Sequence, residues 1–191
     1  MCRIAGFVLA ACLLVVFLDG GPARGQSSSN AAPTAALNVP SNEAGFDPIP
    51  PPEFLAEVDR IVEWIFENSP YDRMDTMPAF VKVPRTTINY IVYSQLPEGY
   101  QQQDCINALY TPPIILLAED FESVGCNFTL VHELVHHLQW ESAAEFRCTL
   151  EAEREAYEIQ ALWVMETGIG EMPSPLFLRR LTCNNPHDFS R

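Results

Sequence analysis

The segment TLVHELVHHLQW, residues 129–140, contains three of the four histidines of this chain. His132 and His136 are four residues apart, so a helix would place them one turn apart on the same face. Two imidazoles in this arrangement can bind one zinc ion. Glu133, beside His132, can then take a proton from a water held by that ion, which is the chemistry of the H-E-x-x-H pattern. The segment therefore predicts a zinc site with Glu133 as general base and acid.

The residues around this pattern help to separate it from an ordinary core helix. Leu134 and Val135 fill the two positions between the histidines, as expected for a helix buried beneath its metal. In a core helix without a metal, a buried Glu133 carboxylate without a partner would cost free energy, which disfavours that interpretation. His137 points about 100° away from His136 on a helix, so we expect it to be exposed or to support the ligands from behind.

The segment HELVH resembles the zincin superfamily of metallopeptidases. One branch, the metzincins, continues as HExxHxxGxxH, but this chain has Gln139 and Ser142 where that pattern needs Gly and His. Gluzincins instead take a third ligand from a glutamate on a following helix. The resemblance covers the H-E-x-x-H helix and the segment after it, and the chain is similar to uncharacterised families of short, secreted bacterial HExxH proteins. This resemblance implies a minimal zincin fold and peptide-bond hydrolysis.

The third ligand is sought in the segment CTLEAEREAYEIQALWVMETG, residues 148–168. We expect a buried stripe on this helix, made of Ala152, Ala156, Ile159 and Trp163. At about 100° per residue, Glu155 is the carboxylate closest to the Ala152 direction, whereas Glu153 lies about 100° away on the other side. Glu155 also stands in REAYE, which looks like the gluzincin pattern. Glu155 is therefore preferred, Glu151 comes second, and Glu158 or the distant His187 remain open.

A zincin site also needs an edge strand to pair with an extended peptide and a donor to stabilise the oxyanion. The run PIILLA, residues 113–118, precedes the H-E-x-x-H segment and is the edge-strand candidate. Tyr157, Tyr110 and His137 are the donor candidates. These roles follow from the resemblance and not from spacing alone.

The elements that must position these groups can be outlined from periodicity. Apolar spacing predicts a helix over 52–70, and Pro70 stops it. Residues 86–94 and 114–118 are predicted as strands because they are β-branched, aromatic or apolar, and 95–113 as loop or an irregular third strand. Helices are expected from Phe128 to about Trp140 and from Ala144 or Cys148 to about Glu166. The result is an α+β domain with a small mixed sheet, an active-site helix and a ligand helix.

The chain ends and cysteines give further expectations. Residues 1–25 resemble a secretory signal peptide, 26–52 are predicted to form a Pro/Ser/Ala-rich leader that packs little, and 53–191 form one domain. We expect a secreted or periplasmic protein without a stable membrane span after signal cleavage; lipidation at Cys12 is the alternative. Two disulfides are expected among the four remaining cysteines; three pairings are possible, and the sequential pairs Cys105–Cys126 and Cys148–Cys183 are preferred.

The charge balance limits the possible partners. The chain has 11 Lys and Arg against 25 Asp and Glu, so nucleic acid is not an expected partner. The sequence predicts an exported zinc metallopeptidase acting on polypeptides. The alternatives are a zinc-binding protein-interaction module with weak or absent catalysis, and a purely structural domain held by disulfides.

Overall fold

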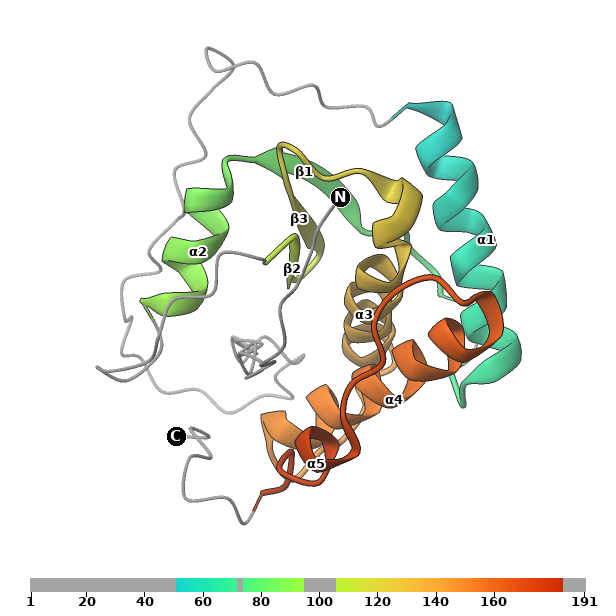
Figure 1. Cartoon of the computed structure of the whole chain (residues 1–191), viewed down its shortest axis with the longest axis vertical. Helices are drawn as coiled ribbons and strands as arrows, with labels where there is room; N and C mark the ends of the chain where they lie inside the picture. Colours follow the sequence, from blue (N-terminus) through green and yellow to red (C-terminus); the bar gives the residue numbers. More distant parts are fainter. Residues whose placement is uncertain (1–50, 72–73, 95–105, 184–191) are drawn as a thin grey trace, which may run out of the picture.

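A computed structural model describes residues 51–71, 74–94 and 106–183, with only the backbone described for 123–126. The signal peptide, nearly all of the leader, Cys105 and His187 therefore lie outside the described residues. The elements in chain order are α1 (Pro52–Asn68), β1 (Ala79–Val83), α2 (Arg85–Tyr93), β2 (Ala108–Thr111), β3 (Ile114–Ala118), α3 (Ser123–Glu141), α4 (Thr149–Thr167) and α5 (Pro175–Leu178) (Figure 1). The predicted α+β class and the three long helices over 52–70, 128–140 and 148–166 are confirmed.

The sheet is small and mixed, with strand order β1-β3-β2. β1 pairs parallel with β3, and β2 pairs antiparallel with it. β3, the PIILLA run, is therefore the central strand, and its assignment as the edge strand is wrong. The physical reason is β1, a five-residue strand that apolar periodicity does not predict and that occupies the second side of β3. Among the described strands, β2 is the edge strand that lies next to the H-E-x-x-H helix.

The composition of residues 86–94 predicts a strand, but the structure has the helix α2 there, beginning after Pro84. Its buried residues are Ile88, Asn89 and Val92, which follow the spacing of one helical face, whereas Tyr90 is exposed. Strand preference depends on the surface that a segment packs against, and here burial of a helical stripe prevails over β-branched composition.

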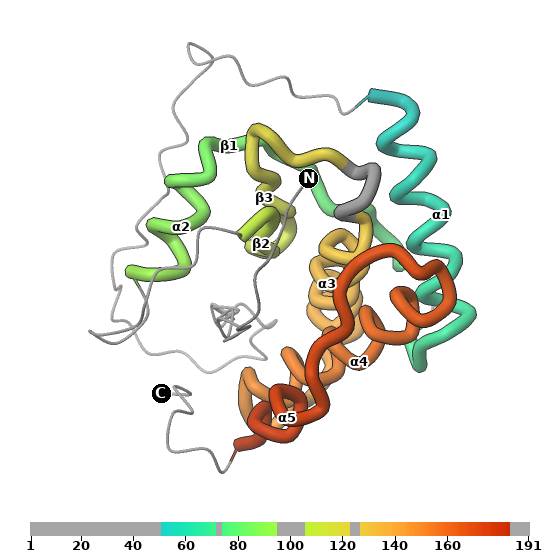
Figure 2. The backbone as a smooth tube through the Cα atoms, viewed as in Figure 1, coloured from blue at the N-terminus to red at the C-terminus, as the bar shows by residue number. Residues whose placement is uncertain are grey.

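α3 is the helix that connects the sheet to the other long helices. It lies against β2, α1 and α4, while α2 lies next to β3. In Figures 1 and 2, α2 stands on the left of the sheet and α1, α3 and α4 on its right. Leu130, Val131, Leu134 and Val135 of α3 are completely buried. None of the helices in the described ranges combines the length and apolar character needed to cross a bilayer.

α4 is fixed at both ends. Gly168 follows its last residue in the left-handed conformation, with φ of 69°, which a glycine adopts without steric cost. At the other end, Cys148 forms a disulfide with Cys183, as the sequence predicted. The bond ties the start of α4 to the segment after α5. Of the other predicted pair, Cys105 lies outside the described residues and only the backbone of Cys126 is described.

Replacing both Cys148 and Cys183 by Ser is expected to lower the free energy of unfolding by about 4 kcal/mol, because the bond closes a loop of 35 residues in the unfolded chain. Urea unfolding of the metal-free protein measures the change. The matched control is the same comparison in reductant, where the wild type and the double variant should be equally stable because the bond is then absent from both. An unchanged midpoint in the double variant would contradict this expectation.

Candidate metal centre

Three side chains from α3 and α4 converge on one point. The Nε2 atoms of His132 and His136 are 3.1 Å apart. The Glu153 carboxylate places Oε2 3.3 Å from Nε2 of His132 and Oε1 3.4 Å from Nε2 of His136. Ligand atoms about 2.0–2.1 Å from a tetrahedral zinc ion are separated by about 3.3 Å. The three distances, one between the two Nε2 atoms and one from each Nε2 to a different oxygen of Glu153, are each close to that separation.

Burial of these groups makes a cation at this point physically reasonable. The exposed fractions are 3% for His132, 1% for His136 and 0% for Glu153. Among the described residues, both carboxylate oxygens of Glu153 lack a hydrogen-bond partner. The Nδ1 atom of His132 also lacks one. A buried carboxylate without hydrogen bonds is costly unless it is paired with positive charge or coordinates a metal. The cluster could therefore hold a metal ion.

The third member of the cluster is Glu153, not the predicted Glu155. The expected stripe is centred on Ala152, but α4 also buries Gln160 and Val164, which moves the centre of its buried face towards Glu153. Glu153 lies only about 20° from Gln160 and about 60° from Ala156 around the helix, whereas Glu155 lies about 100° from Ala156. Val164 points within about 20° of Glu153, but apolar residues lie on several sides of α4, including the exposed Leu162 and Met165, so they do not single out one face.

The other candidate ligands lie elsewhere. The Glu155 carboxylate accepts hydrogen bonds from the Tyr71 hydroxyl and from Nε2 of Gln139. Glu151 pairs with Arg147. The pairing partner of Glu158 is Arg154, 3.7 Å away at the surface. These three carboxylates are outside the cluster, and His187 is outside the described residues.

Glu133 lies in the interior between α3 and the sheet, with 2% of its surface exposed. Its Oε2 accepts a hydrogen bond of 2.7 Å from the backbone N–H of Tyr110 in β2. Burial raises the pKa of the Glu133 carboxyl, although the neighbouring imidazoles act in the opposite direction. The edge strand β2 thus donates a hydrogen bond to Glu133, the carboxylate predicted from the sequence to transfer protons.

His137 is completely buried, so of the two placements expected for it, exposed or behind the ligands, the exposed one is wrong. Its Nε2 lies 2.7 Å from the carbonyl oxygen of Thr76, to which it must donate. Its Nδ1 then accepts from the Tyr110 hydroxyl, 3.1 Å away. His137 therefore fastens β2 and the segment before β1 to α3, and both it and the Tyr110 hydroxyl are engaged there. Of the three donor candidates, Tyr157 packs on the cluster, with its ring centroid 4.3 Å from that of His132.

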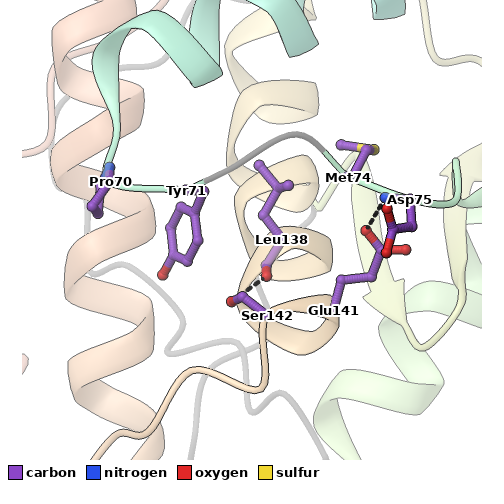
Figure 3. Close-up of a pocket in the computed structure, with 7 residues that line it drawn as sticks. All are labelled: Pro70, Tyr71, Met74, Asp75, Leu138, Glu141 and Ser142. Atoms are coloured by element: carbon purple, nitrogen blue, oxygen red, sulfur yellow. Dashed lines mark hydrogen bonds between the residues drawn. The ribbon is translucent and has the colours of Figure 1, made fainter.

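A pocket of about 490 Å³ opens beside the C-terminal half of α3 (Figure 3). It is lined by Pro70, Tyr71, Met74, Asp75, Leu138, Glu141 and Ser142. The Glu141 carboxylate there accepts the backbone N–H groups of Asp75 and Thr76, at 3.1 and 2.8 Å. No member of the metal cluster lines the pocket, so the two features are separate.

The cluster is strongly polarised when no metal is bound. Burial alone would raise the pKa of Glu153, but the charge of His136 and the closeness of both imidazoles, at 3.3 and 3.4 Å, lower it to about 2. Burial alone would lower the pKa of His136, but the Glu153 carboxylate raises it to about 9. At neutral pH the metal-free cluster is therefore a buried ion pair of imidazolium and carboxylate.

In the metal-free protein, the ion pair of Glu153 and His136 is expected to contribute most to stability between about pH 4.5 and 6.5. The lowered pKa of Glu153 contributes stability that is present above 4.5 and lost as the pH falls towards 2. The raised pKa of His136 contributes stability that is present below 6.5 and lost as the pH rises through 9. The alkaline loss should be on the order of 2–3 kcal/mol.

Urea unfolding after chelation, at pH 3.5, 5.5 and 9, measures this profile. Zinc-loaded protein is the control, because a metal replaces the proton on His136 and its stability should not fall between pH 6.5 and 9. A metal-free protein that is equally stable at pH 5.5 and 9 would contradict the ion pair.

Comparison with known proteins gives a family but no activity. Residues 51–173, more than half of the chain, match the family described as a domain of unknown function (DUF6647). The comparisons with curated proteins and with solved structures found no match. The matched segment runs from the residue before α1 to beyond α4 and so includes the whole cluster. The chain belongs to the DUF6647 family.

Proposed function

We propose that this chain is a zinc-dependent metallopeptidase of the gluzincin-like type, with His132, His136 and Glu153 as ligands. The observation that carries the proposal is the close approach of the three ligand groups next to the buried carboxylate of Glu133. The two Nε2 atoms are 3.1 Å apart and lie 3.3 and 3.4 Å from the two oxygens of Glu153. Two imidazoles and one carboxylate form a donor set found in catalytic zinc sites, which keep a fourth position for water or substrate.

Zinc, Glu133 and Tyr110 would each have a separate role in the proposed reaction. Zinc, when bound, would supply a Lewis acid and lower the pKa of a water at its open position. Glu133 accepts the proton of the attacking water and delivers it to the leaving nitrogen. The backbone N–H of Tyr110 orients the Glu133 carboxylate. Burial raises the pKa of Glu133, which suits a group that must bind and release a proton.

Substrate placement would use β2 and Tyr157. β2 is the strand at the sheet edge beside α3, so an extended peptide could add to it and pass close to Glu133. Tyr157 is the donor candidate for the oxyanion, because its ring already lies against His132. β2 thus takes the role that the sequence had given to β3.

A second candidate function is a zinc-binding interaction module without efficient turnover. The observation in its favour is enclosure: the three ligands and Glu133 are each at most 3% exposed. Glu133 also already accepts the Tyr110 N–H at 2.7 Å. In this case the metal would stabilise the contact between α3 and α4, and partners would bind elsewhere.

One comparison separates the two functions. Purified chain starting at residue 26 and its Glu133→Gln variant are loaded with zinc, analysed for metal content, and incubated with a broad peptide library. The peptidase proposal expects one zinc in each protein and cleavage by the wild type only. One zinc in each protein with equal inactivity would favour the interaction module, and absence of zinc from the wild type would overturn both.

A further inference from the structure

A chain of hydrogen bonds runs from the metal cluster to Tyr71. Nδ1 of His136 lies 2.8 Å from Oε1 of Gln139. Nε2 of Gln139 donates to Oε2 of Glu155 at 2.9 Å, and the Tyr71 hydroxyl donates to the same oxygen. Gln139 is 1% exposed, while Glu155 and Tyr71 are partly buried. The chain thus joins α3, α4 and the segment after α1.

We propose that Gln139, supported by Glu155 and Tyr71, is the positioning residue that prepares His136 to bind metal. This inference rests on the metal site of the proposed function but not on peptide cleavage. It gives Glu155 a role behind the ligands in place of the ligand role predicted from sequence.

The direction of each hydrogen bond is set by the acceptors around Gln139. Its Nε2 faces two acceptors, the Ala152 carbonyl oxygen at 3.0 Å and the Glu155 carboxylate at 2.9 Å, so the amide nitrogen must be on that side. Oε1 therefore faces His136 and can only accept. Nδ1 of His136 must carry a proton, which leaves the lone pair of Nε2 for the metal once the imidazole is neutral.

Gln139 also controls the geometry between the two helices. The Ala152 carbonyl that it binds belongs to the residue before Glu153, so one amide contacts both a ligand of α3 and the backbone beside the ligand of α4. The two histidines differ in this respect. Nδ1 of His132 has no hydrogen-bond partner in the described part of the chain. His136 is therefore the ligand that is oriented before metal arrives.

The outer end of this series of hydrogen bonds, at Tyr71, reaches the pocket beside α3. Tyr71 forms part of the wall of that pocket, opposite Leu138 and Ser142 (Figure 3). Its hydroxyl fixes the Glu155 carboxylate, and the negative charge of Glu155 in turn polarises the Gln139 amide towards His136. The influence of each residue on the metal should therefore decrease from Gln139 to Glu155 to Tyr71.

The test measures zinc affinity by competition with a chelator in the purified mature chain. Gln139→Met, which keeps the shape but loses both hydrogen-bonding ends, should weaken zinc binding about 10- to 100-fold. Glu155→Gln should weaken it less, by about 3- to 10-fold, and Tyr71→Phe least. Matched controls that keep wild-type affinity are Gln160→Met, a buried glutamine of α4, Glu158→Gln, and Tyr90→Phe at the surface.

A second readout distinguishes positioning from general stability. In zinc-loaded wild type, ¹⁵N-edited NMR should show a slowly exchanging proton on Nδ1 of His136, and Gln139→Met should lose that protection. Equal zinc affinity in Gln139→Met and wild type, or equal weakening in Gln160→Met, would overturn the inference. If Gln139→Met does not fold, the ratio between Glu155→Gln and Glu158→Gln decides. A wild type that binds zinc but cleaves no peptide overturns only the peptidase proposal.

Discussion

Glu133→Gln is expected to lower kcat for peptide hydrolysis by about 10²- to 10⁴-fold, the usual contribution of a positioned general base and acid. The amide oxygen of glutamine can still accept the 2.7 Å hydrogen bond from the Tyr110 N–H, so the side chain should keep its place. It cannot accept a proton from water. Steady-state kinetics on a peptide found by library screening, together with zinc analysis of each preparation, measures the effect.

Two controls keep this result specific. Glu158→Gln makes the same chemical change on an exposed position of α4 and should leave kcat unchanged. The unfolding free energy of Glu133→Gln should not fall, because the change removes a carboxyl whose pKa burial raises and whose ionisation costs stability above pH 4.5. Retained activity in zinc-loaded Glu133→Gln would remove Glu133 from the reaction.

Glu153→Gln is expected to weaken zinc binding about 10²- to 10³-fold, because it removes the only carboxylate ligand of the cluster. The consequence for stability can be calculated. Zinc at a thousand times the wild-type Kd stabilises the folded chain by about 4 kcal/mol, and the same zinc concentration should add only about 0.4 kcal/mol to a variant that binds a thousandfold more weakly. Urea unfolding with and without zinc measures both increments.

The matched comparison is Glu155→Gln, two residues away on the same helix. The Glu155 carboxylate accepts hydrogen bonds from Tyr71 and Gln139 and lies outside the cluster. Glu155→Gln should therefore still bind one zinc ion, with a loss in affinity of about tenfold or less. Increments from zinc, not absolute stabilities, are compared, because Glu153→Gln also leaves His136 without its ion partner. A larger effect at 155 than at 153 would reverse the assignment.

The sequence by itself determined the parts of the site that belong to a single helix. His132, Glu133 and His136 are separated by one turn or less, so the regular geometry of a helix is enough to bring them together. Apolar spacing identified the helix at 52–70, and a long segment without internal Pro or Gly indicated the helix at 148–166. The even number of cysteines in the expected mature chain led to two expected disulfides, and the preferred Cys148–Cys183 bond is present. These inferences needed only local geometry or simple pairing.

Tertiary structure decided which surfaces face one another. The rotation of α4 against α3 brings Glu153 to the histidines and turns Glu155 towards Gln139 and Tyr71, and a helix of mixed polarity does not specify that rotation by its apolar residues alone. Likewise, β1 decided that β3 is central, and burial of Ile88 and Val92 decided that 85–93 is a helix. In each case the deciding contact lies far away in the sequence, and the packing energy that selects it exists only once the partner surface is present.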